Sequence, residues 1–438
     1  MRNFVYIVVF YLSLIGLQAQ ELLTKDEALR ISLEQNFDIK VSEKNTEIAK
    51  NNTSIYNSGY LPTANVNSGL GYSSNNSELK AQDGATIGVR DAASTNYNAS
   101  VGLNYLLFDG MNRKYNFKKL KETLNLTELQ ARQVIENTLL NLYFSYFEVA
   151  RLTENKQNQK KTLEISKRRL LRTGYSAEYG QSTKLDILNA EVDVNNDSIN
   201  YLESKRQLLN SKRNLNAVLG RDVSVTSFNV ETDVVYAINL NPDDVLTNAL
   251  ANNVLLLQVN KGIELSNYDI LIRKSGWMPN VNLTGSYGWN KSINDQPVGF
   301  SFASNERYGL NTGVTLGWNI FDGGRTKTSV QNAKITLESR VIEKQQFTEE
   351  LKRDVYNAWE LYKNALFKLE VQRSNVETNK RNFERTNEQY KLGQVTSIDF
   401  RLAQINLLNA EQDVSTSKYE AKNAEFQLMY LSGDLLNN

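Results

Sequence analysis

Hydrophobic residues recur along the chain either with the spacing of an α-helix or with the spacing of a β-strand. The helical segments are unusually long. No proline or glycine occurs between Gly110 and about Thr173, and strong helix formers dominate there. One helix of about 64 residues, roughly 95 Å long, is therefore expected. A similar helix is expected from about Arg325 to Lys391. After a short glycine-containing break, each is followed by a second helix, at Thr183 to Leu219 and at Thr396 to Leu431. The sequence thus predicts two long antiparallel helical hairpins.

The helix expected at 183–219 carries a heptad seam, in which spacings of three and four alternate. Such a seam predicts that each hairpin packs in coiled-coil fashion. The Asn and Arg within it indicate contact with several neighbours or with water, because a dry two-stranded seam rarely holds such residues. The seam positions are Leu185, Leu188, Val192, Asn195, Ile199, Leu202, Arg206 and Leu209.

Four shorter segments alternate apolar and polar residues with a period of two, which predicts β-strands of about ten residues. They form two hairpins, at 63–108 and 280–321. Asp83, Asp91, Asn294, Asp295 and Pro297 are expected in exposed loops between the paired strands. The apolar faces consist of Ala64, Val66, Leu70, Tyr72; Tyr97, Ala99, Val101, Leu103, Tyr105, Leu107; Val281, Leu283, Tyr287, Trp289; and Tyr308, Leu310, Val314, Leu316, Trp318, Ile320.

The polar faces of these strands hold Gly, Ser, Asn and Thr and almost no charged residues. A soluble β-sandwich, which is the alternative, more often places charge on its polar face. Uncharged polar residues opposite an apolar face are typical of a wall between lipid and a water-filled lumen. Four strands cannot close a barrel, and open sheet edges are not tolerated in lipid. The chain is therefore expected to oligomerise, and three copies would supply twelve strands.

The sequence contains two copies of one pattern. Residues 101–220 align with residues 314–433 without a gap, so equivalent positions differ by 213 (314 − 101). We expect repeats at 20–220 and 240–438, joined by an irregular segment at 221–241. Two repeats predict a single pseudo-symmetric protomer whose faces need partners, rather than an array of small units. Matching residues include Phe108/Phe321, Tyr143/Tyr356, Gly180/Gly393, Thr183/Thr396, Asp186/Asp399, Ala190/Ala403 and Gly220/Gly433.

The repeats also share the residues that join helices to strands. In the first repeat, Pro62 can end a helix because its φ is fixed and it lacks an N–H. Asp109 can cap the helix that follows the hairpin, and Gly110 permits a tight bend. The equivalent residues in the second repeat are Pro279, Asp322 and Gly323. A Ca²⁺ or phosphate site is the alternative for the Phe-Asp-Gly motif, but its duplication at a strand-to-helix boundary favours a structural role.

Residues 1–19 have the pattern of a secretory signal peptide. Arg2 precedes an apolar run from Phe4 to Leu17, and cleavage is expected near Ala19. An N-terminal anchor helix is the alternative, but the run is shorter than the ~20 residues that span a bilayer. The mature chain at 20–438 is then expected to be one protomer.

Composition argues against several classes of function. Lys and Arg number 50 against 49 Asp and Glu, so the basic charge typical of nucleic-acid binders is missing. The chain has no His and no Cys, which removes the commonest general base, transition-metal ligand and thiol nucleophile. No loop has the spacing of a Ca²⁺ or phosphate site. We therefore expect no enzymatic activity, no metal, no cofactor and no nucleic-acid partner.

The order and repetition of these features resemble the TolC-like outer-membrane efflux protein family. The resemblance covers the whole mature chain and includes Phe-Asp-Gly-Gly-Arg before a long helix and Gly-x-x-Thr-x-x-Asp after it. It implies a mainly α fold with a small transmembrane β part, in which a homotrimer forms a long periplasmic α-barrel and a 12-stranded β-barrel. The segment 221–241 resembles the family's equatorial region, where Val223, Val225, Val234 and Val235 suggest short strands.

The function implied by the resemblance is that of an exit duct in the outer membrane of a Gram-negative bacterium. The duct would belong to a tripartite efflux pump or a type I secretion system and would be a passive conduit for small molecules or proteins. Its implied partners are a periplasmic adaptor protein, an inner-membrane transporter and outer-membrane lipid. The rival interpretations are a soluble periplasmic coiled-coil adaptor or structural protein, which leaves the strands unexplained, and an outer-membrane enzyme.

The resemblance also suggests site residues. The family's periplasmic gate corresponds to Asp186, Asp399 and Tyr390, although the two carboxylates could instead be ordinary solvated residues of a first helical turn. The family's gate arginine is Val395 here, and its second acidic residue is Leu402, so a different latch is expected. The hairpin tips match the adaptor-docking sites of the family, or are simple turns; they comprise Gly180, Gln181, Thr183, Gly393, Gln394 and Thr396.

Two further features have a structural and a functional interpretation. The aromatic cluster could mark a substrate path, but packing between adjacent helices is favoured. The basic stretch from Lys156 to Arg172 is interpreted as a solvated outer face. The aromatic residues are Tyr143, Phe144, Tyr146, Phe147, Tyr356, Trp359 and Tyr362.

Overall fold

The computed structural model describes residues 21–80, 82–237, 240–296 and 302–437. The predicted signal peptide and Pro297 lie outside the described residues. The chain divides into a helical unit, made of residues up to Asn45, Glu128–Val259 and Lys344–Asn438, and a sheet unit, made of Thr46–Thr127 and Asn260–Glu343. Each unit therefore draws on both sequence repeats.

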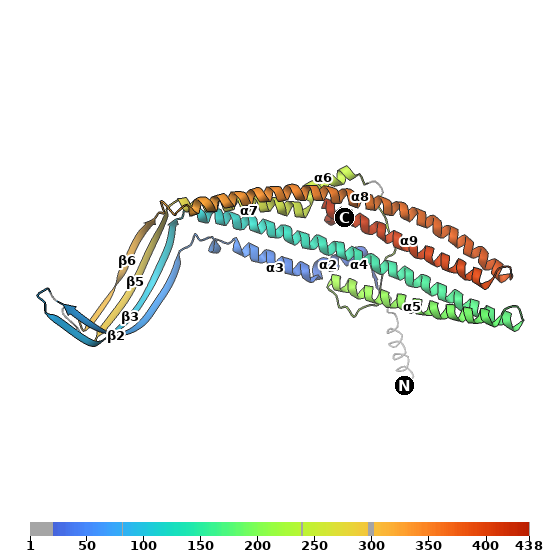
Figure 1. Cartoon of the computed structure of the whole chain (residues 1–438), viewed down its shortest axis with the longest axis horizontal. Helices are drawn as coiled ribbons and strands as arrows, with labels where there is room; N and C mark the ends of the chain where they lie inside the picture. Colours follow the sequence, from blue (N-terminus) through green and yellow to red (C-terminus); the bar gives the residue numbers. More distant parts are fainter. Residues whose placement is uncertain (1–20, 81, 238–239, 297–301, 438) are drawn as a thin grey trace, which may run out of the picture. The chain divides into compact units, whose positions relative to one another are not determined.

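Four long helices dominate the structure, as the sequence predicts (Figure 1). α4 (Asn112–Glu178) and α8 (Arg325–Lys391) have 67 residues each, and α5 (Lys184–Leu219) and α9 (Ser397–Ser432) have 36 each. The equal lengths confirm that the repeated sequence folds into repeated helices. α4 extends beyond the expected end at Thr173 because Gly174 is accommodated in its last turns.

The ends of α5 and α9 are set by the same pair of residues in both repeats. Thr183 and Thr396 are the N-caps, and each side chain accepts a hydrogen bond from a backbone N–H in the first turn. Gly220 and Gly433 end the helices in the left-handed region, at φ +71° and +76°. An added Cβ would also lie 2.4 Å from the Gln35 carbonyl oxygen at Gly220, so only glycine fits there.

Within the helical unit, the four helices lie side by side in the order α5–α4–α9–α8 (Figure 1). Ser166 of α4 donates to Asp197 of α5 at 2.5 Å. Lys418 of α9 donates to Glu154 of α4 at 2.7 Å. Lys368 of α8 bonds Glu420 of α9 at 2.8 Å. α4 and α9 are therefore the inner members of this four-helix layer, and α5 and α8 are its edges.

The predicted heptad seam on α5 is not the face that packs within the hairpin. Its apolar members are exposed except for the half-buried Leu209, with Leu185 at 64%, Ile199 at 63% and Leu202 at 62%. α5 packs on α4 with a parallel stripe of smaller and more polar residues instead. That buried stripe consists of Ala190, Asp197, Ser204, Leu208, Ser211 and Leu215. Small residues allow the two helices to approach closely, and Asp197 is paired, so the apolar stripe remains free for another contact.

The core of the helical unit lies between α4 and α9. The ring of Tyr143 stacks on that of Phe426 with 4.2 Å between centroids, and Phe147 contacts both Phe426 and Tyr419. The aromatic cluster of the first repeat thus packs between adjacent helices, as the favoured interpretation holds. A second core joins Val355 and Tyr362 of α8 to Leu428 of α9.

Shorter elements accompany the long helices and the sheet. Strand β1 (Glu21–Leu23) pairs in parallel with β4 (Phe228–Val230), and the Tyr146 hydroxyl joins them by donating to the Leu23 carbonyl at 2.8 Å and accepting from the Glu231 N–H at 3.0 Å. The segment 221–241 does contain one short strand, β4, but it lies between the two pairs of valines that suggested strands there, and the valines themselves are not in strands. The remaining short elements are α2 (Lys25–Gln35), α3 (Phe37–Asn52), η1 (Ile55–Asn57), α6 (Pro242–Asn252), α7 (Val254–Lys274), η2 (Ser275–Trp277) and η3 (Leu435–Asn437).

The sheet unit contains one antiparallel sheet of four strands in the order β2-β3-β5-β6. The strands are β2 (Thr63–Lys80), β3 (Thr86–Phe108), β5 (Asn280–Asn294) and β6 (Ser304–Gly317). Val66 pairs with Val101, Val101 with Tyr287, and Tyr287 with Leu310. The register therefore joins the predicted apolar faces into one continuous face, and β2 and β6 are left as edges.

The strands differ from the prediction in several places, and Asn294 is the last residue of β5 rather than a loop residue. β2 and β3 are longer than expected, and Asp91 lies inside β3 with φ 56° rather than in a loop. Its N–H donates to Asn76 Oδ1 at 2.6 Å beside an irregularity of register. β6 ends at Gly317, so Trp318 and Ile320 lie beyond the sheet. The Trp318 indole donates instead to the Trp277 carbonyl at 3.1 Å.

Candidate functional site at the hairpin tips

The two helical hairpins end in equivalent glycine turns. Gly180 and Gly393 have φ +71° and +75°, and each is followed by an N–H that bonds back to the helix, from Gln181 to Ser176 at 2.8 Å and from Gln394 to Gln389 at 2.9 Å. These turns are Schellman-type caps that close the ends of α4 and α8. No atom lies within 4 Å of a Cβ built on either glycine. The tips are thus held by backbone conformation and present an exposed surface.

The two carboxylates suggested by the resemblance cap the helices that follow the tips. Asp186 Oδ2 accepts from the backbone N–H of Thr183 at 2.8 Å and from its hydroxyl at 2.7 Å, and Asp399 makes the same bonds to Thr396 at 3.1 and 2.6 Å. The hydroxyl and N–H bonds lower the pKa of both carboxyl groups, because they stabilise the ionised form. Each pair is a capping box, so both carboxylates have a structural task within their own turn.

Tyr390 lies in a different environment from these carboxylates. Its ring stacks on Phe400 with 4.8 Å between centroids, and its hydroxyl is 3.3 Å from the Thr173 hydroxyl of α4. The Arg172 guanidinium lies over the ring at 5.6 Å. Tyr390 therefore connects the end of α8 to both α9 and α4, whereas Asp186 borders a cavity on the α5 side. The structure does not gather the three suggested gate residues into one cluster.

A buried polar network that the sequence did not reveal lies next to the tips. Arg401 of α9 holds Asp197 of α5 by two bonds, Nη1 to Oδ2 at 2.7 Å and Nη2 to Oδ1 at 2.8 Å. Arg169 of α4 pairs with Asp193 of α5, and Arg401 Nε lies 3.5 Å from the same carboxylate. Gln404 bonds Ser166 at 3.0 Å. The network, which we call the tip network, ties α9 to both helices of the first hairpin.

The tip network corrects the interpretation of the basic stretch at Lys156 to Arg172 at one residue, while Lys160, Lys161, Lys167 and Arg168 are exposed as expected. Arg169 is not on a solvated face, because only 3% of it is exposed. Burial of a cation requires a partner of opposite charge, and Asp193 supplies it. The signal available in the sequence was the pair Asp193 and Asp197, four residues apart on one face of a helix.

In the sheet unit, the junction residues hold the chain where β3 and β6 return to helix. The Asp109 carboxylate accepts from the Arg113 N–H at 2.8 Å, and Asp322 accepts from the Thr326 N–H at 2.8 Å. Gly110 has φ +68°, and an added Cβ would lie 2.7 Å from both Met278 Cβ and the Ser275 carbonyl oxygen. Gly323, at φ +70°, faces open space. Pro62 and Pro279 stand directly before β2 and β5.

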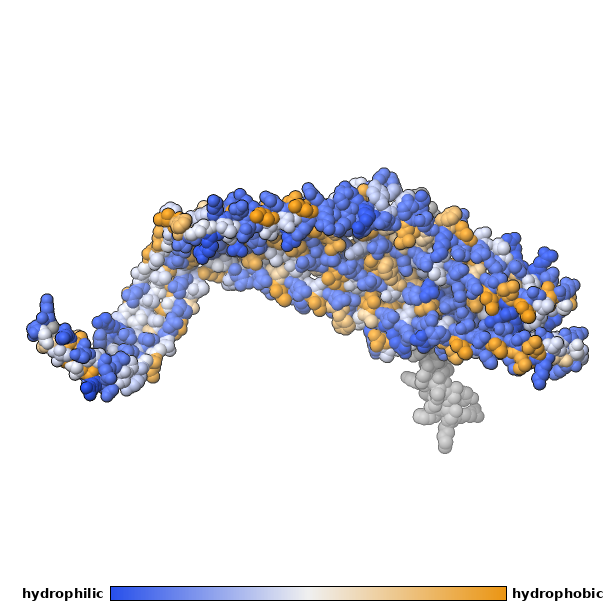
Figure 2. Space-filling view, viewed as in Figure 1, coloured by the Kyte–Doolittle hydropathy of each residue, from blue (hydrophilic) through white to orange (hydrophobic). Residues whose placement is uncertain are grey.

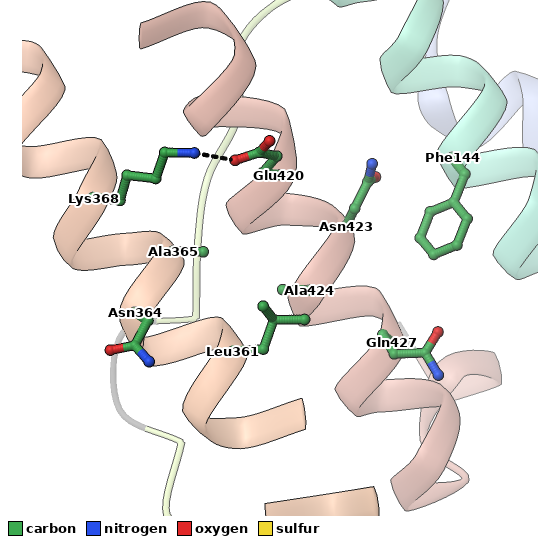
Figure 3. A pocket seen from close by; sticks show the side chains of 9 residues that line it. All are labelled: Phe144, Leu361, Asn364, Ala365, Lys368, Glu420, Asn423, Ala424 and Gln427. Carbon is green, nitrogen blue, oxygen red and sulfur yellow. Dashed lines mark hydrogen bonds and ion pairs between the residues drawn. The ribbon is translucent and has the colours of Figure 1, made fainter. Parts of the chain in front are cut away.

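A groove of about 560 Å³ opens between α8 and α9 in the helical unit (Figure 3). Lys368 and Glu420 bond across one side of it, and Phe144 of α4 lies at the other. The rest of the wall mixes aliphatic side chains with neutral amides, namely Leu361, Ala365, Ala424, Asn364, Asn423 and Gln427. Such a wall offers weak, unspecific contacts rather than a set of groups aimed at one reacting atom.

The residues that the structure describes lack two further kinds of feature. No helix in them is both long and apolar enough to cross a membrane. No group of three or more His, Cys, Asp or Glu side chains in them is placed to hold a metal ion.

Comparison with known proteins identifies the family. The sequence model of the family described as "Outer membrane efflux protein" matches residues 28–221 and 245–434. The outer membrane efflux protein BepC of Brucella suis biovar 1 is 21% identical over 404 residues, which cover 91% of this chain and 84% of BepC. The outer membrane protein TolC of Vibrio cholerae is 22% identical, with 72% of this chain and 73% of TolC covered.

Solved structures agree in fold. The outer membrane channel CmeC of Campylobacter jejuni superimposes with a TM-score of 0.77 at 16% identity, over 94% of this chain and 86% of CmeC. The open state of the Neisseria gonorrhoeae MtrE outer membrane channel gives 0.69 at 16% identity, over 94% and 89%. The family match decides against the soluble adaptor interpretation. The chain belongs to the outer membrane efflux protein family, whose members are channel and transport proteins of the outer membrane.

Proposed function

We propose that this protein is the outer-membrane exit duct of a tripartite efflux pump or a type I secretion system, and that it conducts solutes passively. The family match and the outer membrane proteins among its relatives support this role. One relative is named a proteases secretion protein, PrtF of Dickeya chrysanthemi, at 19% identity over 99% of this chain and 93% of PrtF. Export of either small molecules or proteins is therefore compatible with the family.

The observation that carries the proposal is that both units end in open edges. The sheet exposes β2 and β6, whose outer backbone groups need partners in lipid. Val66, Leu70 and Leu310 on its apolar face are at least 69% exposed in the single chain. Three copies would join their edges into a twelve-stranded barrel with this face toward lipid. The four-helix layers would close in the same way into a periplasmic tunnel.

The tips are the proposed docking surface for a periplasmic adaptor protein, which would connect the duct to an inner-membrane transporter. The motivation is that the tips are exposed, rigid and duplicated. Gly180 and Gly393 fix the turns, while Gln181 and Gln394 present amides and Thr183 and Thr396 begin the next helices. Replacing either glycine by valine would strain a left-handed residue. We expect the variant protein to assemble normally but to lose export when it is tested together with its adaptor. Full export would contradict the docking role.

At the periplasmic end, Asp186, Asp399 and Tyr390 are the proposed gate residues. In a trimer, three Asp399 and three Asp186 carboxylates would favour cations where the duct is narrow. This chain has Val395 where the family has its gate arginine. We propose that the tip network, through Arg401, holds the gate closed instead.

Conductance across planar bilayers tests the duct directly. Protein extracted from the outer-membrane fraction is expected to give discrete channels, and absence of channels from correctly folded protein would contradict the proposal. The Asp186→Ala and Asp399→Ala variants should lose cation preference and block by multivalent cations. If the double variant keeps both, the two carboxylates act only as helix caps.

A further inference from the structure

The four helices of the layer differ in the number of faces that the chain itself buries. α9 has two buried stripes. One of them includes Ala424 and Leu428 and packs on α8, and the other includes Tyr419 and Phe426 and packs on α4. The first stripe is Ala403, Ala410, Ser417, Ala421, Ala424 and Leu428, and the second is Gln404, Leu408, Ser415, Tyr419 and Phe426.

α5, the equivalent helix of the first repeat, buries only one of these two stripes. The residues 213 positions before the first stripe are its buried face, from Ala190 to Leu215. The residues equivalent to the second stripe are all exposed: Glu191, Asn195, Leu202, Arg206 and Arg213. Leu188, Val192 and Ile199 extend this open face with exposed apolar side chains. Hydrophobic surface is visible over the end of the molecule that holds α5 (Figure 2).

α8 shows the same difference from its equivalent, α4. Tyr143 and Phe147 of α4 are buried against α9, whereas the corresponding Tyr356 and Glu360 of α8 are exposed. The edge helices α5 and α8 thus each lack one neighbour that the equivalent helix of the other repeat has inside the chain. α5 lacks a helix of the α4 type, and α8 lacks a helix of the α9 type.

We infer that the open face of α5 in one copy packs on the open face of α8 in the next copy, in the register that α9 and α4 use within the chain. This inference rests on the proposed assembly into a ring, and it adds which residues meet. Shifting each observed α4–α9 contact by 213 positions, forward for α4 and backward for α9, gives the contacts between copies.

One polar contact between α4 and α9 within the chain has a largely apolar equivalent between copies. Within the chain, Glu154 accepts from Ser415 at 2.6 Å and from Tyr419 at 3.0 Å. The equivalent of Glu154 is Phe367, and its partners become Leu202 and Arg206 of the next copy. Phe367 is 66% exposed in the single chain. Packing against Leu202 and the Arg206 stem would remove this ring from water, which supplies a driving force for the contact.

The shifted contacts also pair opposite charges. Inside the chain, Phe147 contacts Tyr419 and Phe426, with ring centroids 5.8 Å apart in both cases. The equivalent of Phe147 is Glu360, and the equivalents of its two partners are both arginines, Arg206 and Arg213. The Tyr143–Phe426 stack becomes Tyr356 with Arg213, a cation–π pair. An aromatic cluster within the chain is thus replaced by complementary charges between copies.

This distribution of charge also disfavours self-pairing of either edge between copies that lie parallel in one membrane. Two α5 faces would bring Arg206 and Arg213 against the same residues, and two α8 faces would oppose Glu360 to itself. Like charges at such positions repel. The contact is therefore head-to-tail, which closes a ring rather than a two-fold dimer.

Cross-linking tests the register, because the chain has no cysteine of its own. Leu202→Cys combined with Phe367→Cys, treated in detergent with a short thiol-specific reagent, should give products up to three linked copies. These positions lie on opposite edges of the layer within one chain, so a link joins two copies. The control pair, Leu202→Cys with Arg381→Cys, moves the second thiol 14 residues along α8, or about 21 Å, and should give no product.

A charge reversal provides an independent measurement. Glu360→Arg should reduce the fraction of assembled particles in detergent, and adding Arg206→Glu and Arg213→Glu should restore it. A trimer that cross-links in the control pair but not in the predicted pair would overturn this register and leave the proposed duct standing. A parent protein that remains a single copy would instead contradict the proposed function itself.

Discussion

Removing the Arg401 guanidinium should release the start of α9 from the first hairpin. In Arg401→Ala, the Asp197 carboxylate loses both of its guanidinium bonds, at 2.7 and 2.8 Å. Asp197 is only 2% exposed, so water does not reach the carboxylate to replace these two hydrogen bonds. Breaking a buried ion pair by removing one partner costs about 3–5 kcal/mol. The Ser166 hydroxyl still bonds Asp197 at 2.5 Å, so we expect the lower end of this range.

This free energy can be measured as local opening. About 3 kcal/mol corresponds to a roughly 150-fold larger open population. Hydrogen exchange of the α9 segment at 397–410 should therefore become faster by about two orders of magnitude, because exchange there follows local opening. Exchange of the α9 core near Phe426 should change little, since that segment is held by the aromatic cluster.

The matched control is Arg381→Ala on α8. Arg381 pairs with Glu377 at 3.8 Å, but the two side chains are 70% and 63% exposed. Such a pair contributes ~0–1 kcal/mol, so exchange should stay near that of the parent. If Arg401→Ala changes the exchange of 397–410 no more than Arg381→Ala does, the tip network does not hold α9 and the reasoning from its burial is wrong.

Three further changes have defined outcomes. Tyr146→Phe removes the hydroxyl that bonds Leu23 and Glu231 and should lower the free energy of unfolding by about 1–3 kcal/mol, measured by denaturant in detergent, whereas Tyr143→Phe keeps its stacked ring and should change it little. Gly110→Ala should lower the apparent melting temperature more than Gly323→Ala, because both have positive φ but only Gly110 meets atoms at 2.7 Å; equal effects would show that close approach is unimportant. Hydrogen bonds lower the pKa of Asp186 and Asp399 below the ordinary 3.8, so their stabilisation is complete above pH 3.8 and is lost as pH falls through the lower folded-state pKa. The melting-temperature gap between the parent and an Asp186→Asn, Asp399→Asn variant should accordingly close in that acidic window, and a constant gap would contradict this linkage.

Local rules were enough to predict the four long helices, the four strands of the sheet and the ends of α5 and α9. Helices begin at Thr183 and Thr396 and end at Gly220 and Gly433 because capping and left-handed φ are properties of a few neighbouring residues. The sheet register follows from the period of two, since a slip by one residue would turn Val101 and Tyr287 to the other face. Local rules failed at the ends of β6 and within β3, where Trp318 and Asp91 form bonds to distant residues.

The faces and the tip network could not be predicted from local pattern. α5 has two parallel stripes with similar spacing, and hydrophobicity alone selects the one with Leu188 and Leu202 as the inner seam. The inner stripe contains Asp197 instead, and its burial is possible only because Arg401 lies next to it. That arginine is 204 residues away in the sequence. Which stripe faces inward is therefore decided by the tertiary partner and not by the helix itself.

The mass of the detergent-solubilised particle tests the central claim most directly. The protein should be extracted from the outer-membrane fraction by detergent and its protein mass measured by light scattering after gel filtration. Three copies in one stable particle are predicted, since β2, β6, α5 and α8 all need partners that a single chain lacks. A folded single copy, stable in the membrane and in detergent, would contradict the account.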